Sequence, residues 1–496
     1  MSEAPEPMPS LRPVVGDGGA VDTRVAGITG GLGEDDLAAL RPQIATLIDE
    51  IGHGGLQAGA DIEGMLSARI ADIDALLAAQ VNAIIHAPEF QRLEASWRGL
   101  HYLVSLTDVS ATLKVRVLHA SKDDLRKDLE AASEFDQSAL FKKVYEDEYG
   151  IFGGEPFGAL IGDYEFGRHP QDAALLERIS NIAAAAHAPF LSAASPSLFG
   201  WDSFAELTAP RQLAKIFTAA EYVKWRAFRE SEDSRYVGLT LPRVLMREPY
   251  NPEVVRAESF NFQEDVDGRD HAKYLWGNAA YALGTRLADA FARYGWCATI
   301  RGIDGGGLVD GLANAAFATD AGKVAGKGPT EIVVTDLREK ELADLGFIPL
   351  VYCKGSDYAA FFSTQSCQKP KRYDRDEANA NARLATQLQY VLATSRFAHY
   401  LKVMMRDKTG TVTSASDSED FLNRWLMNYC LGNPESADLE AKARKPLRDG
   451  HVTVREVKGR PGNYEAVVHL QPHFQLDELT VSLRLVTELP APARGR

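Results

Sequence analysis

Cysteine is scarce in this chain of 496 residues, which holds four cysteines, at positions 297, 353, 367 and 430. No two of them stand in a C-x-x-C pair, so neither a disulfide framework nor a zinc site is expected. Long apolar runs are also missing. The most apolar stretch, residues 182–194, is interrupted by His187 and Pro189 and is too short to cross a bilayer. We therefore expect no membrane insertion.

Basic residues are in deficit, because 54 Lys and Arg stand against 69 Asp and Glu and give a net charge of −15. A phosphate backbone attracts basic surfaces, so nucleic acid is not expected as a partner. The first residues lack the basic start and the apolar core of a secretory signal, which predicts a cytoplasmic protein. With 45% hydrophobic and 25% charged residues, the chain has the composition of an ordinary globular protein.

Sequence signatures of catalysis are missing as well. The glycine-rich run 304–310 approaches the G-x-G-x-x-G pattern, but Asp310 at its end would repel a pyrophosphate. Residues 322–328 lack the spacing and the hydroxyl residue of a phosphate-binding P-loop. Neither G-x-S-x-G nor H-E-x-x-H occurs. We therefore expect no enzyme activity, no cofactor and no metal, and we expect His86, His187 and His399 to make structural hydrogen bonds.

Apolar periodicity predicts a mixture of helices and strands. Residues 61–84 and 90–104 repeat apolar side chains every three or four positions, as amphipathic helices do, whereas residues 113–117 alternate as a half-buried strand does. Further helices are expected at 34–51, 172–186, 271–294, 337–346, 379–405 and 421–431. Further strands are expected at 157–161, 297–300, 332–335, 347–353, 451–457, 464–470 and 480–485. This mixture predicts an α+β fold class with a mixed α/β core.

The composition changes along the chain and predicts three regions. Residues 1–60 form a flexible N-terminal arm, rich in Pro and Gly, with one short helix. Residues 61–375 hold the N-terminal and middle region, and residues 376–496 hold the C-terminal region with a long helix and the terminal strands. At roughly 150 residues per domain, the length agrees with a multi-domain chain.

Three aromatic pairs allow two interpretations. Core packing is favoured for each, and an interface anchor is the alternative because Trp and Tyr dominate interface hot spots. The pairs are Trp97 with Tyr102, Tyr222 with Trp225, and Trp425 with Tyr429.

Two charged features point to interfaces. Residues 442–460 hold seven basic and two acidic side chains, a local charge of +5, and they flank the predicted C-terminal strands. An edge strand with basic flanks is suited to pairing with an acidic neighbour. The helix predicted at 337–346 is mostly acidic, for which a solvated face is the ordinary interpretation.

Several long segments, taken in order, resemble the large subunit of type VI secretion contractile sheaths, the TssC/VipB family. The resemblance covers about residues 61–488. Its most specific segments are FQRLEASWRGLHYLV (90–104), FGALIGDYEF (157–166), AHAPFLSAASPSLFG (186–200), KYLWGNAAYALGTRLADAFARYGWC (273–297) and the segments 229–252, 330–371 and 446–474.

The resemblance implies a structural, tail-sheath-like protein rather than an enzyme. The large subunit would pair with the small sheath subunit (TssB/VipA), and further copies would polymerise into a helical tube around the Hcp inner tube on a baseplate. Contraction would propel tube, spike and effectors into a target cell. The AAA+ unfoldase ClpV would then recycle the sheath. Residues 1–33 depart from the N-terminal helix that ClpV grips in the family, so no residue is assigned to it. The alternative is a one-component sheath of a phage-tail-like or extracellular contractile injection particle.

The resemblance also implies three sets of contact residues. Strands shared between subunits would involve Val452, Val454, Tyr464, Val467, Leu470 and Leu483. The acidic helix would meet basic residues of the inner tube through Asp336, Glu339, Glu341 and Asp344. A further hypothesis is that the small subunit contacts Leu66, Ile70, Ile73 and Trp97, although the apolar side chains of these two helices could equally form internal core.

Overall fold

The computed structural model describes residues 62–473 apart from 152, 210–211, 253–259, 261, 269, 319–323, 357, 408–413, 434–435 and 457–463. Its contacts divide the chain into unit 1 (residues 1–80 and 258–261) and unit 2 (residues 81–257 and 262–496). The helix α3 (Ile62–Ile85) begins in unit 1 and ends in unit 2. The predicted helix at 34–51 and the predicted strand at 480–485 lie outside the described residues.

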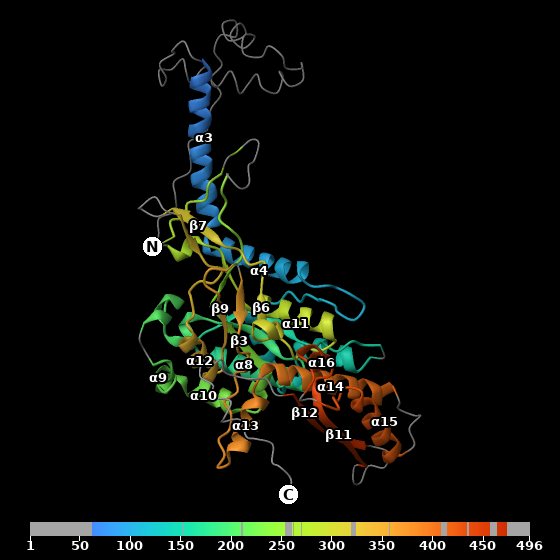
Figure 1. The fold of residues 1–496 in the computed structure, drawn as a ribbon. Coiled ribbons are helices and arrows are strands. Elements are labelled where there is room, and N and C mark those ends of the chain that lie inside the picture. Colours follow the sequence, from blue (N-terminus) through green and yellow to red (C-terminus); the bar gives the residue numbers. More distant parts are fainter. Residues whose placement is uncertain are drawn as a thin grey trace, which may run out of the picture. The chain divides into compact units, whose positions relative to one another are not determined.

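A six-stranded mixed sheet forms the centre of unit 2 (Figure 1). Its order is β1-β2-β3-β9-β10-β6, in which β1, β2, β3 and β9 run parallel while β10 is antiparallel to both its neighbours. The strands are β1 (Leu160–Phe166), β2 (Phe190–Ala194), β3 (Val237–Leu241), β9 (Ile348–Tyr352), β10 (Ala359–Phe361) and β6 (Leu308–Val309). β2 and β3 are buried along their whole length, which suits strands covered on both faces.

Successive strand residues feed two different cores, one on each face of the sheet. Phe190 belongs to the core that holds Leu176 and Ile179 of α8. The next residue, Leu191, belongs to the core that holds Leu283 of α11. This alternation is the period of two that a strand imposes on its side chains, so the sheet is sandwiched between helices. The α+β prediction is confirmed.

The helices of unit 2 before the C-terminal region are mostly short. The longer ones are α4 (Pro88–Ser105), α5 (Lys122–Ala131), α8 (Pro170–Ala186), α10 (Val223–Glu230), α11 (Ala280–Tyr294) and α12 (Asp336–Asp344). The short ones are α6 (Ala139–Phe141), α7 (Asp147–Tyr149) and α9 (Leu213–Ile216), with single turns between them. Two small antiparallel pairs complete this region: β4 (Val244–Leu245) with β5 (Trp276–Gly277), and β7 (Ala315–Ala318) with β8 (Val324–Lys327).

The C-terminal region has a core of its own. Its helices are α13 (Asp376–Ala385), α14 (Leu388–Asp407), α15 (Ala415–Met427) and α16 (Leu439–Arg444). They are followed by a hairpin of β11 (Leu447–Glu456) and β12 (Tyr464–Pro472), drawn in red in Figure 1. Trp296 stacks on Phe397 with 4.2 Å between ring centroids, and Leu426 and Val452 are buried in the same cluster. This core joins α14, α15 and the hairpin.

Three predicted strands are wrong, and only the one at 332–335 shows the alternating burial of a strand. At 113–117 the chain is extended but unpaired, and Lys114 and Arg116 hold it through ion pairs with Glu155. At 332–335 the chain buries Ile332 and Val334 without pairing with a strand, and at 297–300 it buries the adjacent Thr299 and Ile300, again without strand pairing. Apolar alternation needs one buried face, which an extended segment can have without a neighbouring strand.

Two predicted long helices are interrupted. Residues 271–294 contain one turn and β5 before α11 begins at Ala280, whose N–H donates to the Asn278 carboxamide oxygen at 2.8 Å. Residues 379–405 are split between α13 and α14, because the backbone of Thr386 accepts a hydrogen bond from the Ser366 N–H at 3.0 Å. The first break comes from a local side-chain hydrogen bond and the second from a tertiary one, and periodicity reveals neither.

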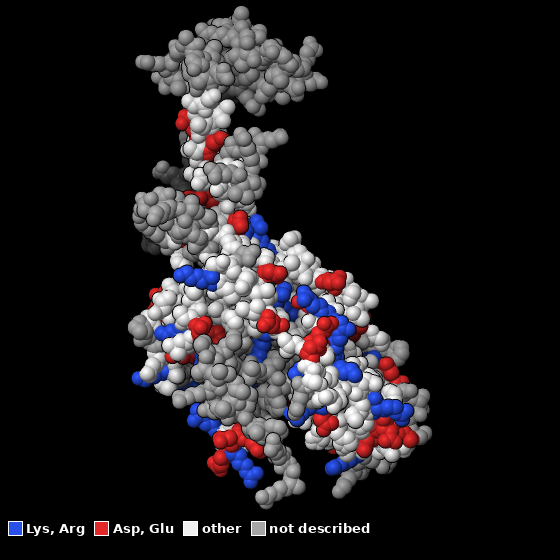
Figure 2. Space-filling model, in the orientation of Figure 1, with Lys and Arg blue, Asp and Glu red and all other residues white. Residues whose placement is uncertain are grey.

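The described surface is mixed in charge. On the face drawn in Figure 2, basic and acidic side chains of the described residues are interspersed rather than gathered into one broad area of one sign. In the part of the chain that the structure describes, no single helix is long and apolar enough to span a membrane, although α3 and α4 reach that length and apolarity when they are counted together.

Candidate assembly interfaces

The C-terminal hairpin pairs over nine residue pairs, from Leu447 opposite Pro472 to Glu456 opposite Tyr464. The structure places the predicted inter-subunit residues on different sides of it. Val452 and Val454 are buried against α15, while Val467 is 41% exposed. Leu470 is partly buried at the rim of the same core, Tyr464 begins β12, and Leu483 lies outside the described residues.

The acidic helix α12 presents only part of its charge to solvent. Asp336 and Asp344 are exposed, whereas Glu339 and Glu341 are half-buried. The Glu341 carboxylate pairs with Arg338 of the same helix, with 2.5 Å between Oε2 and Nη1. An inner-tube contact would therefore depend first on Asp336 and Asp344.

Glu339 turns toward the protein rather than outward. Its carboxylate accepts a hydrogen bond from the Ser363 hydroxyl, two residues after β10. Burial raises the pKa of Glu339, and the bond from Ser363 opposes that rise. The side chain therefore helps to fix α12 against the sheet.

The helices α3 and α4 carry exposed apolar side chains. On α3, Ile70 is 58% and Ile73 is 47% exposed. On α4, Trp97 is 66% exposed, and Leu93 lies four residues earlier on the same helical face. The side chain of Leu66 lies outside the described residues. On each of the two helices, the exposed apolar side chains lie about one turn apart.

The core interpretation is therefore wrong for Trp97, because that side chain faces solvent. It is confirmed for Tyr222 and Trp225, which are buried in the main core. Trp425 and Tyr429 pack against the C-terminal core, with 5.0 Å between their ring centroids. Periodicity alone could not separate these cases, since Trp97, Trp225 and Trp425 all lie on helices with apolar repeats.

A buried ionic network, which the sequence did not reveal, holds α4 in place. Arg247, two residues after β4, donates to the carboxylates of Glu94 and Glu264 at 2.8 Å and 2.5 Å. Glu94 also accepts from the Arg98 Nε at 2.7 Å, and His86 Nε2 lies 3.2 Å from Glu264. These bonds connect α4, the turn before it and the segment that follows residue 261. The exposed face of α4 is thus presented on a rigid support.

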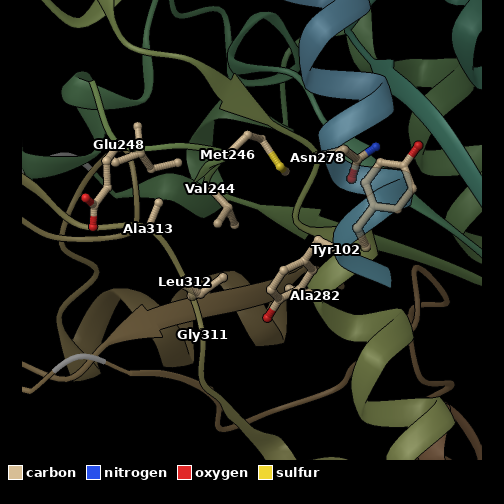
Figure 3. A pocket seen from close by; sticks show the side chains of 11 residues that line it. Tyr102, Val244, Met246, Glu248, Asn278, Ala282, Gly311, Leu312 and Ala313 are labelled. Atoms are coloured by element: carbon tan, nitrogen blue, oxygen red, sulfur yellow. The ribbon is translucent and has the colours of Figure 1, made fainter. Parts of the chain in front are cut away.

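A cavity of about 290 Å³ lies between α4, β4 and α11 (Figure 3). Side chains that line it include Tyr102, Val244, Met246, Asn278 and Leu312. The Tyr102 hydroxyl donates to the Asp310 carbonyl oxygen at 2.9 Å, and burial raises the pKa of Tyr102 to about 12. The Asn278 amide donates to two carbonyl oxygens of β1. Both polar groups are engaged by backbone, which indicates packing rather than catalysis.

The predicted structural histidines make hydrogen bonds to protein groups. His399 Nε2 lies 3.0 Å from the Ala186 carbonyl oxygen, and His187 Nδ1 lies 3.4 Å from the Tyr236 hydroxyl. Among the described residues, no group of three His, Cys, Asp or Glu side chains is placed to hold a metal ion.

Family models account for almost all of the described chain. The N-terminal domain of the EvpB/VC_A0108 tail sheath (VipB) matches residues 67–368, and the gpW/gp25-like domain of the same sheath matches residues 377–489. The chain belongs to the VipB tail sheath family. The resemblance stated from the sequence is thereby confirmed.

A curated VipB relative is similar over most of its length. The type VI secretion system sheath protein TssC1 of Pseudomonas aeruginosa (strain PAO1) is 51% identical over 424 residues, which is 85% of each chain. The present chain is therefore a large-subunit sheath protein of the type VI secretion class. Among solved structures, the baseplate of the anti-feeding prophage has a chain with a TM-score of 0.33 at 10% identity, covering 62% of this chain and 65% of that one. That likeness is too weak to support an argument.

Proposed function

We propose that this VipB chain pairs with a small sheath subunit and polymerises with it into a helical tube around an Hcp-type inner tube. The observation that carries the proposal is the exposed apolar face of α4, on which Leu93 and Trp97 are each more than half exposed. Burying side chains of this size stabilises a complex by about 1.5–3 kcal/mol each. An obligate partner supplies the burial that the chain alone lacks.

Contraction would then propel the inner tube, its spike and effectors into a target cell. A contractile lattice needs contacts that hold subunits together while they rotate, and contacts that release the tube quickly. Strands shared through the C-terminal hairpin suit the first need, because backbone hydrogen bonds resist separation. Exposed Asp336 and Asp344 on α12 suit the second, because charge pairs at a wet interface are weak.

The assembly would work in the bacterial cytoplasm, attached through a baseplate to a membrane complex, with no enzymatic step of its own. Its energy would be stored at assembly in an extended, metastable lattice. ClpV is a candidate for recycling the contracted sheath, without a residue assigned to it.

Negative-stain microscopy of this chain co-expressed with its small sheath subunit tests the proposal. We expect striated tubes of uniform diameter that are absent when either chain is omitted. Tubes formed by this chain alone would favour the alternative, a one-component sheath of a phage-tail-like or extracellular injection particle. Soluble particles in every combination would overturn both.

A further inference from the structure

Two histidines of the C-terminal hairpin stand directly opposite each other. His451 of β11 and His469 of β12 are partners in the antiparallel ladder. Side chains that are directly opposite in such a ladder leave the same face of the sheet, with Cβ atoms about 4.5–5.5 Å apart. The register therefore brings two imidazole rings together, although spacing in the sequence does not reveal the pair.

Both imidazoles are on the solvent face of the hairpin. Val452 and Val454 turn to the other face, where they are buried against α15. Since side chains alternate along a strand, His451 and its partner His469 point away from that core, and both are exposed. Their ring nitrogens are thus accessible to a ligand from solvent.

Neither imidazole is engaged by another protein group. Within the described part of the chain, the rings of His451 and His469 have no hydrogen bond, ion pair or ring contact. The buried His187 and His399 differ in this respect, because a ring nitrogen of each lies within hydrogen-bond distance of a protein oxygen. The hairpin histidines therefore keep their ring nitrogens available for a ligand.

The backbone that carries the pair is held by α15. The Asn423 carboxamide donates to the Val452 carbonyl oxygen and accepts from the Val452 N–H, both at 2.8 Å. The Glu419 carboxylate accepts from the Val454 N–H at 2.8 Å. These bonds fix β11 directly after His451, and the ladder fixes β12 against it. Only rotation of the side chains is needed to bring both rings to one ion, so little ordering entropy is lost on binding.

The charges on this face of the hairpin allow a cation. The neighbouring ladder pairs on the face are Asp449 with Gln471, Thr453 with Val467, and Arg455 with Glu465. Asp449 is exposed two residues before His451, so its negative charge lowers the cost of bringing a cation there. The positive charge of Arg455 lies farther along the strand and is offset by Glu465 opposite it.

Two imidazoles on one face are a ligand set for a transition metal ion. Zn²⁺ and Cu²⁺ bind neutral imidazole nitrogens, with Zn–N distances of about 2.0–2.1 Å. Ca²⁺ and Mg²⁺ prefer oxygen ligands and would gain little from this pair. Because no group of three ligands among the described residues is placed to hold a metal ion, water would complete the coordination of an ion held by the two histidines.

We propose that His451 and His469 form a two-histidine site for a divalent transition metal ion, Zn²⁺ or Cu²⁺, on the exposed face of the C-terminal hairpin. The bound ion connects β11 to β12, because each strand supplies one ligand. Only the closed hairpin offers both ligands together, so the ion binds that state and opposes separation of the strands. The site belongs to the single chain and does not depend on the proposed sheath function.

Calorimetric titration of the untagged full-length chain with Zn²⁺, after a chelator has removed bound metal, tests the ligands. We expect the tightest site to take one ion per chain. His451→Gln and His469→Gln should each weaken that site at least tenfold, because a single imidazole cannot chelate. The matched control replaces two other exposed histidines, His101→Gln with His119→Gln, and should bind as the wild type does. Undiminished affinity in His451→Gln, or an equal loss in the control, would overturn the proposal.

Electron paramagnetic resonance of the wild-type chain with one equivalent of Cu²⁺ counts the nitrogen ligands without relying on a variant. We expect coupling to two imidazole nitrogens, and the loss of one of them in His469→Gln. A spectrum with a single nitrogen ligand in the wild type would overturn the proposal.

Amide hydrogen exchange tests whether the ion connects the strands. The polar backbone groups of Val452 point toward α15, so those of Thr453 and its partner Val467 point into the ladder. Their amides should exchange about tenfold more slowly when free Zn²⁺ is at ten times its Kd, because the ion binds only the closed hairpin. The rate in His469→Gln should not respond to Zn²⁺. Exchange in the wild type that Zn²⁺ leaves unchanged would overturn the proposal that one ion joins β11 to β12.

Discussion

Arg247 and Glu264 form a two-pronged ion pair away from solvent, in which Nη1 donates to Oε2 at 2.5 Å and Nη2 donates to Oε1 at 3.1 Å. Their side chains are 7% and 1% exposed. Through Glu94, which the same arginine also binds, the pair fixes α4 and the apolar face that it presents. The exposed apolar face of α4, which we propose as the partner surface, is thus supported by a charge network on the buried side of the helix.

Removing one charge from this network should be costly, because the other remains buried without compensation. We expect Glu264→Gln to lower the free energy of unfolding by about 3 kcal/mol, measured by urea denaturation. Glu89→Gln breaks the exposed pair with Arg92 at 3.4 Å and is the control, with a change of no more than about 0.5 kcal/mol. Equal effects of the two substitutions would show that the buried network does not support α4.

Two tryptophans on two helices should respond in opposite ways to replacement by alanine. Trp97 is 66% exposed on α4, and we expect Trp97→Ala to weaken binding of the small sheath subunit about 30-fold at unchanged thermal stability. Trp225 is 4% exposed, and its ring lies nearly parallel to that of Phe347. Trp225→Ala should therefore cost about 3–5 kcal/mol of stability. Isothermal titration calorimetry measures the affinity of the two variants for the small sheath subunit, and thermal unfolding measures their stability. Unchanged partner affinity in Trp97→Ala would exclude this face from the interface.

Acidification should destabilise the contact between α14 and the end of α8. Burial, with help from the positive charges of Lys402 and Arg396, lowers the pKa of His399 to about 3, and burial lowers that of His187 to about 4. The unfolded chain binds these protons near pH 6.5. Stability is therefore fully present above pH 6.5 and is lost as the pH falls toward 4, by about 2 kcal/mol at pH 5 for His399 alone.

The measurement is the midpoint of urea unfolding between pH 7 and pH 4.5, above the range in which most carboxylates titrate. His399→Gln keeps a donor for the Ala186 carbonyl oxygen but cannot be protonated, so its profile should be flatter than that of the wild type. His119→Gln, at an exposed position, should follow the wild type. A wild-type slope that His399→Gln retains would assign the acid sensitivity to other groups.

Local pattern was sufficient to predict the elements that have clear signals in their own sequence. The hairpin at β11 and β12 was predicted within a few residues, because alternation and a Gly-Arg-Pro-Gly-Asn turn coincide there. α12 was predicted within two residues, since Asp336 at its start and Gly346 after its end bound it. In both, the local signals agree with the fold.

The predictions that failed concern residues whose partners are distant in sequence. Asn423 and Glu419 look like ordinary polar residues of an amphipathic helix, and only the fold brings them to Val452 and Val454. Glu339 was expected on an acidic surface, but its carboxylate accepts a hydrogen bond from Ser363 and turns toward the protein. Composition gives the charge of a helix, but it does not say which of those charges a neighbouring segment neutralises.

The exposed carboxylates of α12 lead to the last prediction. Asp336 and Asp344 face solvent, whereas Glu339 and Glu341 are held by Ser363 and Arg338. If basic residues of the inner tube bind this helix, the double variant Asp336→Lys with Asp344→Lys should reduce the Hcp-type protein recovered with purified sheaths about tenfold. Because such contacts are screened within about 8 Å at physiological salt, the wild-type complex should also lose inner tube as ionic strength rises.

The matched control makes the same change of charge at another exposed helix start, with Asp376→Lys and Glu377→Lys on α13. These substitutions should leave the recovery of inner tube unchanged, because their charges lie outside α12. Equal losses in the two double variants would indicate a long-range effect of net charge, and full retention in the α12 variant would assign tube contact to a different surface. A selective loss at α12 is the outcome expected if Asp336 and Asp344 form the releasable contact that contraction requires.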